Sequence, residues 1–224
     1  MEREPDLSSK RRTARSERRR LDPKEREAEI TRAAIAFFAR HGFDGSTRDF
    51  AASAGITQPL LYRYFPNKEA LLDRVYQEVF VAPWKEQWED ELADRRLSLE
   101  TRLTRFYRSY AKVILTYDWI RLFMFAGLKG LDFNARYLSF LRKAAFELIV
   151  REIRFSRGLT TRSTASDQEI ELVWGLHASI FYIGVRQFIY GMPVPTDMDA
   201  DLRLRIDAFL RGAPQAVAEF DRRN

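Results

Sequence analysis

The chain contains no cysteine and only two histidines among its 224 residues. Without cysteine there is neither a disulfide nor a thiolate ligand, and His41 and His177 lie too far apart in the sequence to form a local metal-binding motif. We therefore expect no metal site and no cofactor. The absence of cysteine also suits the reducing environment of the cytoplasm.

Long apolar runs are absent as well. No stretch reaches the roughly 18 uninterrupted apolar residues that a membrane span needs, and the first twenty residues lack the apolar core of a signal peptide. We expect a cytoplasmic protein without a membrane partner. A glycine-rich phosphate loop and a cysteine nucleophile are missing too, and no histidines have metal-ligand spacing, so we do not expect an enzyme.

Hydrophobic residues make up 46% of the chain, which is enough to bury a core. The net charge is +6, and its position is informative. Seven basic residues and one acidic residue lie between Ser9 and Arg20, whereas the rest of the chain is neutral. We predict a flexible basic arm over residues 1–21, which indicates a polyanionic partner. Both a solvated tail and an arm that contacts DNA fit these charges.

Helix signals begin directly after this arm. Asp22 and Glu25 have the spacing of a capping box, so a helix is predicted to start there. Apolar residues then recur at helical spacing until the sequence "RHGFDG". We expect Gly42 and Gly45 to end this helix in the left-handed backbone conformation that glycine favours.

Two short helices are predicted next, and a glycine turn separates them. Ser46 and Asp49 repeat the capping pattern at the start of "TRDFAASA", and Gly55 lies in the turn that follows. Thr57 is the N-cap of the second short helix, which ends before Pro66. A longer helix followed by two short ones has the arrangement of a helix-turn-helix motif.

The remainder of the chain also has helical periodicity, and no alternating strand pattern is present. Asn67 is predicted to cap a long helix that runs from Lys68 into the low 90s. Further helices are predicted over 97–116, 119–129, 133–157, 166–190 and 198–210. The pattern therefore predicts an all-α protein with a small N-terminal module and a larger helical body.

The N-terminal module has a family resemblance. The segment "STRDFAASAGITQPLLYRYFPNKEALL", with its supporting helix "ITRAAIAFFARHGFDG", closely resembles the DNA-binding domain of the TetR family of bacterial transcriptional regulators. The shared features are the Gly42-Phe43 pair, the opening from Thr47 to Ala51, the Ala54-Gly55 turn and the run from Tyr62 to Lys68. The resemblance implies a three-helix helix-turn-helix DNA-binding domain over residues 22–70 and a helical ligand-binding and dimerisation domain over 71–224.

The second short helix is the predicted recognition helix. Its first turn meets base edges in the major groove, where Gln58 can bond to adenine and Leu60 can contact a thymine methyl group. The resemblance implies that Tyr62, Tyr64 and Lys68 contact phosphates. Pro59 stands where the family often has a small or polar residue. The full predicted DNA-binding set is Thr47, Arg48, Thr57, Gln58, Pro59, Leu60, Tyr62, Tyr64 and Lys68.

For the body, the resemblance implies a homodimer and a small-molecule effector. We expect a repressor that binds a palindromic operator and is released by that effector. The helix predicted over 166–190 is apolar on more than one side, so it needs several neighbours. Its pairing with the helix over 198–210 would give two helices per subunit and a four-helix bundle across a two-fold axis. The predicted dimer interface is Trp174, Ile180, Phe181, Gly184, Phe188, Leu202, Ile206 and Phe209.

Aromatic residues are dense between Tyr117 and Tyr137, which makes this segment the candidate wall of an effector cavity. The candidate effector residues are Trp119, Phe123, Phe125, Tyr137, His177, Tyr182 and Arg186. Aromatic residues at helical spacing also fit an ordinary core. Two other functions stay open: a regulator without an effector, and a helical adaptor for other proteins with nonspecific affinity for nucleic acid.

Overall fold

The computed structural model describes residues 22–162 and 164–221. The basic arm predicted over 1–21 lies outside the described residues. Every regular element in the described ranges is a helix, which confirms the all-α prediction. Among these residues we find no helix with the length and apolar character required to cross a membrane.

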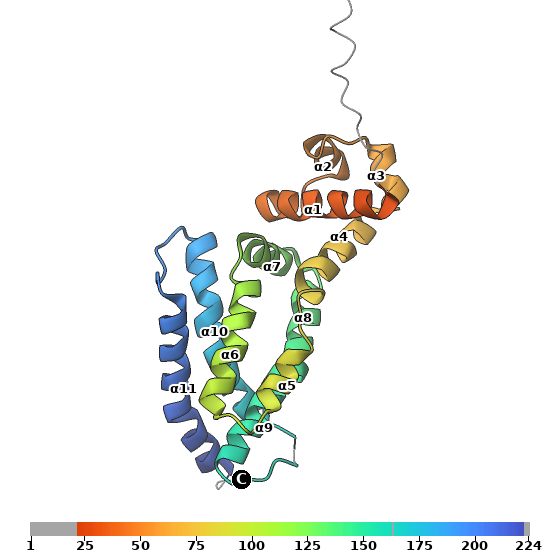
Figure 1. Cartoon of the computed structure of the whole chain (residues 1–224). Coiled ribbons are helices and arrows are strands. Elements are labelled where there is room, and N and C mark those ends of the chain that lie inside the picture. Colours follow the sequence, from red (N-terminus) through yellow and green to blue (C-terminus); the bar gives the residue numbers. More distant parts are fainter. Residues whose placement is uncertain (1–21, 163, 222–224) are drawn as a thin grey trace, which may run out of the picture.

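The N-terminal module consists of α1 (Pro23–His41), α2 (Thr47–Ser53) and α3 (Gln58–Tyr64). These helices form a separate group at one end of the molecule (Figure 1). Gly42 ends α1 with a φ of 75°, as predicted. Gly45 is different, because it has no positive φ. A Cβ atom at this position would lie 2.8 Å from Cε1 of Phe37, so packing explains this glycine.

The helix that starts at Lys68 is shorter than predicted. It comprises α4 (Lys68–Tyr76) and a π-helical turn, η2 (Gln77–Val81), and α5 (Gln87–Ala93) is a separate helix. Pro83 explains the break, since proline has no N–H group and disfavours helical backbone at the residue before it. The prediction of one helix into the low 90s was therefore wrong.

The body continues with helices close to the predicted ranges. They are α6 (Leu99–Ile114), α7 (Tyr117–Lys129), α8 (Phe133–Leu141), the π-helical turn η3 (Arg142–Phe146), α9 (Glu147–Ser156), α10 (Asp167–Phe188) and α11 (Met198–Asp221). The last helix is longer than predicted and contains Pro214. Ala213 and Val217 are buried, so packing against the body extends α11 past the predicted end at Leu210.

The body is an elongated bundle with α10 and α11 side by side, and α4 leads from the N-terminal module into it (Figure 1). Its core is rich in aromatic residues. Trp88, Phe106, Tyr107 and Tyr110 are at most 1% exposed, and their rings pack edge to face or stacked. The N-terminal module is joined to this bundle through α4 and through contacts between α1 and α7.

Candidate DNA-binding surface and effector site

The short helices α2 and α3 are held by side-chain caps at their N-termini. The side chain of Ser46 accepts a hydrogen bond from the Asp49 amide at 3.1 Å, and Asp49 accepts one from the Ser46 amide at 3.3 Å. Hydrogen bonds from Ser46 lower the pKa of the Asp49 carboxyl. The Thr57 hydroxyl accepts from the Leu60 amide at 3.3 Å. Helices of seven residues are marginal alone, so these caps matter for their stability.

A buried layer of aromatic rings fixes the angle between α1, α2 and α3. Phe38 and Phe50 are fully buried and stack with ring centroids 6.1 Å apart. Leu61 and Phe65, on one side of α3, are 1% and 4% exposed. Both residues therefore belong to the core of the module. The opposite side of α3 is thereby turned to solvent.

Three of the predicted DNA-contact residues meet where α2 faces α3. The hydroxyl groups of Thr47 and Tyr62 are 2.9 Å apart, and the Gln58 amide nitrogen donates to the Thr47 hydroxyl oxygen at 3.3 Å. Tyr62 is 43% exposed. The first residue of α2 therefore orients two side chains of the predicted recognition helix.

The other predicted contacts differ in exposure. Arg48, Thr57 and Pro59 are exposed, and Leu60 is half-buried. Tyr64 is also half-buried, because it packs against the hydrophobic core of the module. Tyr62 and Tyr64 thus point to different sides of α3, as their spacing of two residues predicts.

Lys68 has a structural role that the sequence did not indicate. Its ammonium group donates to the backbone oxygen atoms of Phe43 and Gly45 at 2.6 and 2.9 Å. It thereby joins the start of α4 to the turn between α1 and α2. Two of its three N–H groups are used inside the protein, which leaves one for a phosphate, so contact between Lys68 and DNA stays a prediction.

The end of α1 is attached to the body by α7. Arg121 donates to the backbone oxygen of Ala39 at 2.6 Å, and its guanidinium lies 4.9 Å from the ring centre of Phe125. Phe125 in turn packs against Gly42, and Lys129 forms an ion pair with Asp44. Phe125 thus belongs to the contact between the module and the body, which corrects its assignment to an effector cavity.

Four other candidate effector residues do come together in the body. Trp119 stacks on Phe123 with centroids 4.8 Å apart, and Tyr137 lies 5.3 Å from Trp119. His177 joins this group through Phe181, which was expected at the dimer interface and stacks on His177 at 6.3 Å. We call these five residues the aromatic cluster.

Two polar atoms in the aromatic cluster have no hydrogen-bond partner among the described residues. They are Nε1 of Trp119 and Nδ1 of His177, and both side chains are at most 5% exposed. Burial lowers the pKa of His177 to about 4, so its imidazole is neutral at physiological pH. An unpaired buried polar group costs free energy, which makes these atoms suitable partners for polar atoms of a ligand.

Two further candidates lie outside the cluster. Tyr182 is 51% exposed and pairs with Tyr190 on the surface. Arg186 is next to Tyr182, with its guanidinium 6.0 Å from the ring centre. Arg186 is half-buried, and its Nε has no hydrogen-bond partner among the described residues. The role of these two residues at an effector site stays a prediction.

One groove of the body has a volume of about 430 Å³ and lies between η2 and α8; we call it the η2–α8 groove. Its lining includes Tyr76, Phe80, Trp84, Arg136, Tyr137 and Phe140. It adjoins the aromatic cluster, because Phe80 and Tyr137 contact Trp119. Sequence reasoning missed η2 and Arg136 as site elements, since nothing in the local sequence indicates which helix faces them.

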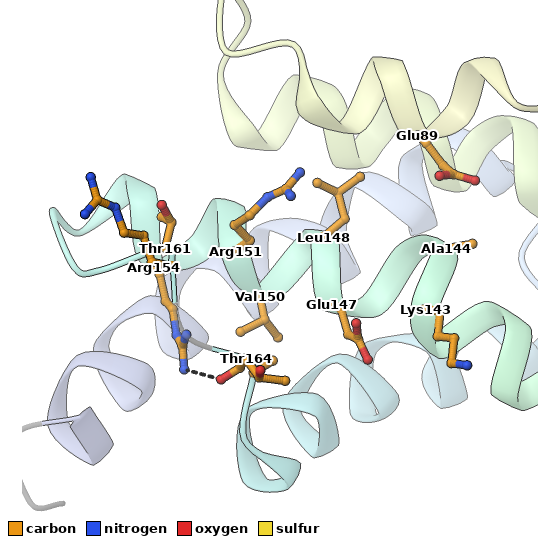
Figure 2. Close-up of a pocket in the computed structure, with 12 residues that line it drawn as sticks. Glu89, Lys143, Ala144, Glu147, Leu148, Val150, Arg151, Arg154, Thr161 and Thr164 are labelled. Carbon is orange, nitrogen blue, oxygen red and sulfur yellow. Dashed lines mark hydrogen bonds between the residues drawn. The ribbon is translucent and has the colours of Figure 1, made fainter.

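Another groove, of about 350 Å³, runs along α9 and the loop before α10. Figure 2 shows that Arg151 and Leu148 point to one side of α9, whereas Glu147 of α9 and Lys143 of η3 point to the other. Arg154 is used internally, since it donates to Glu169 at 2.6 Å. The basic side chains of this groove therefore do not converge on one point. Among the described residues, no group of three His, Cys, Asp or Glu side chains can hold a metal.

Half of the predicted dimer residues belong to the core of the chain itself. Ile180, Leu202 and Ile206 are at most 2% exposed, and Gly184 is buried against Ile120. The apolar stripe of α10 therefore faces α7 and α11 of the same chain, which corrects these four assignments. Trp174, Phe188 and Phe209 are half-buried against the core, and their role at an interface stays a prediction.

Comparisons with known proteins agree with this geometry. Residues 30–75 match the family model described as "Bacterial regulatory proteins, tetR family". The chain is 28% identical over 191 residues to the HTH-type transcriptional repressor KstR2 of Rhodococcus jostii (strain RHA1), which covers 81% of this chain and 88% of the relative. It is 36% identical over 91 residues to the class D tetracycline repressor protein of Escherichia coli, covering 37% of this chain and 41% of the relative.

Among solved structures, a TetR-like transcriptional regulator from Rhodococcus sp. RHA1 has the same fold, with a TM-score of 0.61 and 23% identity. The match covers 86% of this chain and all of that one. The capped α2–α3 pair and these likenesses define a helix-turn-helix DNA-binding transcriptional regulator. Residues 30–75 are a DNA-binding module of the TetR family, and the chain is similar over most of its length to a repressor and to solved structures of this kind.

Proposed function

We propose that this regulator is a homodimeric repressor that binds a palindromic operator through α3 and is released by a small molecule. The observation that carries the proposal is the exposed side of α3, where Gln58 and Tyr62 are oriented by Thr47 at the start of α2. Two similar proteins, KstR2 and the class D tetracycline repressor protein, are named as repressors, which supports repression of transcription over activation. The aromatic cluster and the adjoining groove supply the site for the effector.

The roles within the DNA-binding surface follow from chemistry. Gln58 has a donor and an acceptor that match the major-groove edge of adenine, so it reads sequence. Arg48, Thr57 and Tyr62 have donors suited to phosphate oxygen atoms, so they position the helix. The N-termini of α2 and α3 add backbone N–H groups that also favour phosphate.

The test is selection of bound duplexes from a random library with the purified chain at fixed salt. We expect an enriched palindrome. Gln58→Ala should relax the preference at one position per half-site, by about 1–3 kcal/mol. Tyr62→Phe should weaken binding to all sequences alike, since it removes a hydroxyl that positions the helix. Tyr190→Phe, an exposed tyrosine in the body, is the matched control and should change nothing.

The opposite result has a clear meaning. Binding without an enriched site, and erased by moderate salt, would identify only nonspecific attraction to the phosphate backbone. The proposed repressor would then be rejected in favour of a helical adaptor, because Gln58 would read no base.

A further inference from the structure

The η2–α8 groove has an apolar floor and an open mouth. Tyr76, Phe80 and Tyr137 form the floor, and each is less than 5% exposed. At the mouth, Val81 and Phe140 are 43% and 40% exposed, although both are large apolar residues. An apolar molecule seated here would cover these side chains and contact the floor, so its body is expected to be hydrophobic.

The end of the groove nearest the DNA-binding module carries an arginine, Arg136. The Arg136 guanidinium lies 3.9 Å from the ring centre of Tyr76. Arg136 is 38% exposed and donates to Asp73 of α4 at 3.2 Å, and Asp132 lies 3.7 Å away. Ion pairs this exposed contribute little to stability, so a ligand anion can replace Asp73 at small cost.

The charges around Arg136 also limit the kind of anion. The charges of Arg136, Asp73 and Asp132 sum to a negative value, so they oppose an added anion, and they oppose one with two charges more strongly than one with a single charge. A carboxylate has one charge, and its two oxygen atoms match the planar fork of arginine. Glu86 also lines the groove, and its carboxylate disfavours an anion beside it.

We propose that the η2–α8 groove binds an apolar molecule with a single carboxylate, and that this carboxylate displaces Asp73 as the ion-pair partner of Arg136. The inference rests on the proposed function, because it names the chemical class of the effector. It also explains how the effector would affect DNA binding. Asp73 lies on α4, which begins at Lys68 beside the α1–α2 turn, so loss of the Asp73–Arg136 pair loosens α4 from α8.

The experiment compares each acid with its neutral amide. The probes are benzoate, 2-naphthoate and decanoate with benzamide, 2-naphthamide and decanamide, titrated into the full chain by calorimetry. In at least one pair, the acid should bind at least tenfold more tightly than the amide. Arg136→Gln should remove this preference. Arg108→Gln is the matched control, because it breaks an equally exposed arginine–aspartate pair, Arg108–Asp199, away from the groove.

Asp73→Asn tests the competition directly. It frees Arg136 without removing it, so the acid should bind several-fold more tightly than to the parent chain. Acids and amides that bind equally, or a preference for the acid that survives Arg136→Gln, would overturn the inference. So would failure of every probe to bind.

Operator binding is measured on the same samples without and with the acid. We expect the acid to weaken operator binding by the parent chain, and to do so less in Arg136→Gln. An enriched operator that no acid affects would leave the DNA-binding function standing and reject only the carboxylate effector. An absent operator, with an acid that still needs Arg136, would reject the repressor and keep the ligand class.

Discussion

The buried His177 makes the stability of the chain depend on pH. In the unfolded chain its imidazole binds a proton below the ordinary pKa of about 6.5, whereas burial lowers the pKa to about 4 in the folded chain. Between these values the unfolded state binds more protons, so the free energy of unfolding decreases as the pH falls. We expect a loss of about 1–2 kcal/mol between pH 7 and pH 5.

Urea unfolding at both pH values measures this loss. His177→Phe keeps an aromatic ring among the neighbours of His177 and should reduce the loss. The exposed His41, on α1, provides the matched control, and His41→Gln should leave the loss unchanged. A loss that is equal in the parent chain and in His177→Phe would show that other groups titrate in this range.

Lys68 provides a second prediction about a single residue. Its ammonium group bonds to Phe43 and Gly45, and hydrogen bonds from charged groups contribute more than neutral ones. Lys68→Met should therefore lower the free energy of unfolding by about 1–2 kcal/mol. The exposed Lys112→Met is the control and should change it little. Lys68→Met with full stability but weaker DNA binding would instead assign the residue to phosphate contact.

At the scale of elements, Gly184 allows α10 to approach α7 closely. A Cβ atom here would lie 2.6 Å from Cδ1 of Ile120, so Gly184→Ala forces that side chain to move. The better helix propensity of alanine offsets part of this cost, and we expect a net loss of about 1–2 kcal/mol. Gly175 lies on the same helix with open space at its Cβ position. Gly175→Ala should therefore stabilise the chain by about 0.5–1 kcal/mol.

Thermal unfolding of both variants measures the two effects. Combining Gly184→Ala with Ile120→Val should restore part of the loss, because the shorter side chain makes room for the new methyl group. If Gly184 faced a second subunit instead, the loss would depend on protein concentration. Ile120→Val would then not restore the stability lost in Gly184→Ala.

The elements that sequence reasoning predicted well are those with local signals. The capping boxes at Asp22 and Ser46 form as expected, because each joins residues three positions apart. The same holds for the N-caps of α3 and α4. The break at Pro83 was missed, although it too has a local signal. The extension of α11 had no such signal, because its cause is burial of residues such as Val217.

Contacts between helices were predicted less well. Gly184, Ile180 and Ile206 have the spacing of an apolar stripe, but periodicity does not say whether the stripe faces its own chain or a second one. Arg121 and Arg136 were not singled out, since their partners lie more than sixty residues away. The aromatic cluster was predicted in part because three of its members, Trp119, Phe123 and Tyr137, lie in the dense aromatic segment between Tyr117 and Tyr137.

At the scale of the whole molecule, α2 and α3 lie at the end of the chain opposite to the C-terminus, and α10 and α11 lie side by side along the body (Figure 1). A dimer paired through α10 and α11 would present two copies of α3 on the same side. Two-fold symmetry then requires half-sites about 34 Å apart, or a multiple of this, which is one helical turn of DNA.

This geometry predicts a strict dependence on half-site spacing. Inserting about five base pairs between the half-sites of the selected operator turns one of them to the opposite face of the duplex. The second subunit then cannot bind, and affinity should fall by about 10²-fold or more to that of a single half-site. Inserting one full helical turn of DNA restores the rotation of the second half-site but not its distance from the first. The affinity of a rigid dimer should therefore stay low. Gel-shift titrations at constant salt measure both changes. Affinity that is unchanged by five base pairs would mean that each chain binds its half-site independently, because α10 and α11 would then not hold two subunits in register.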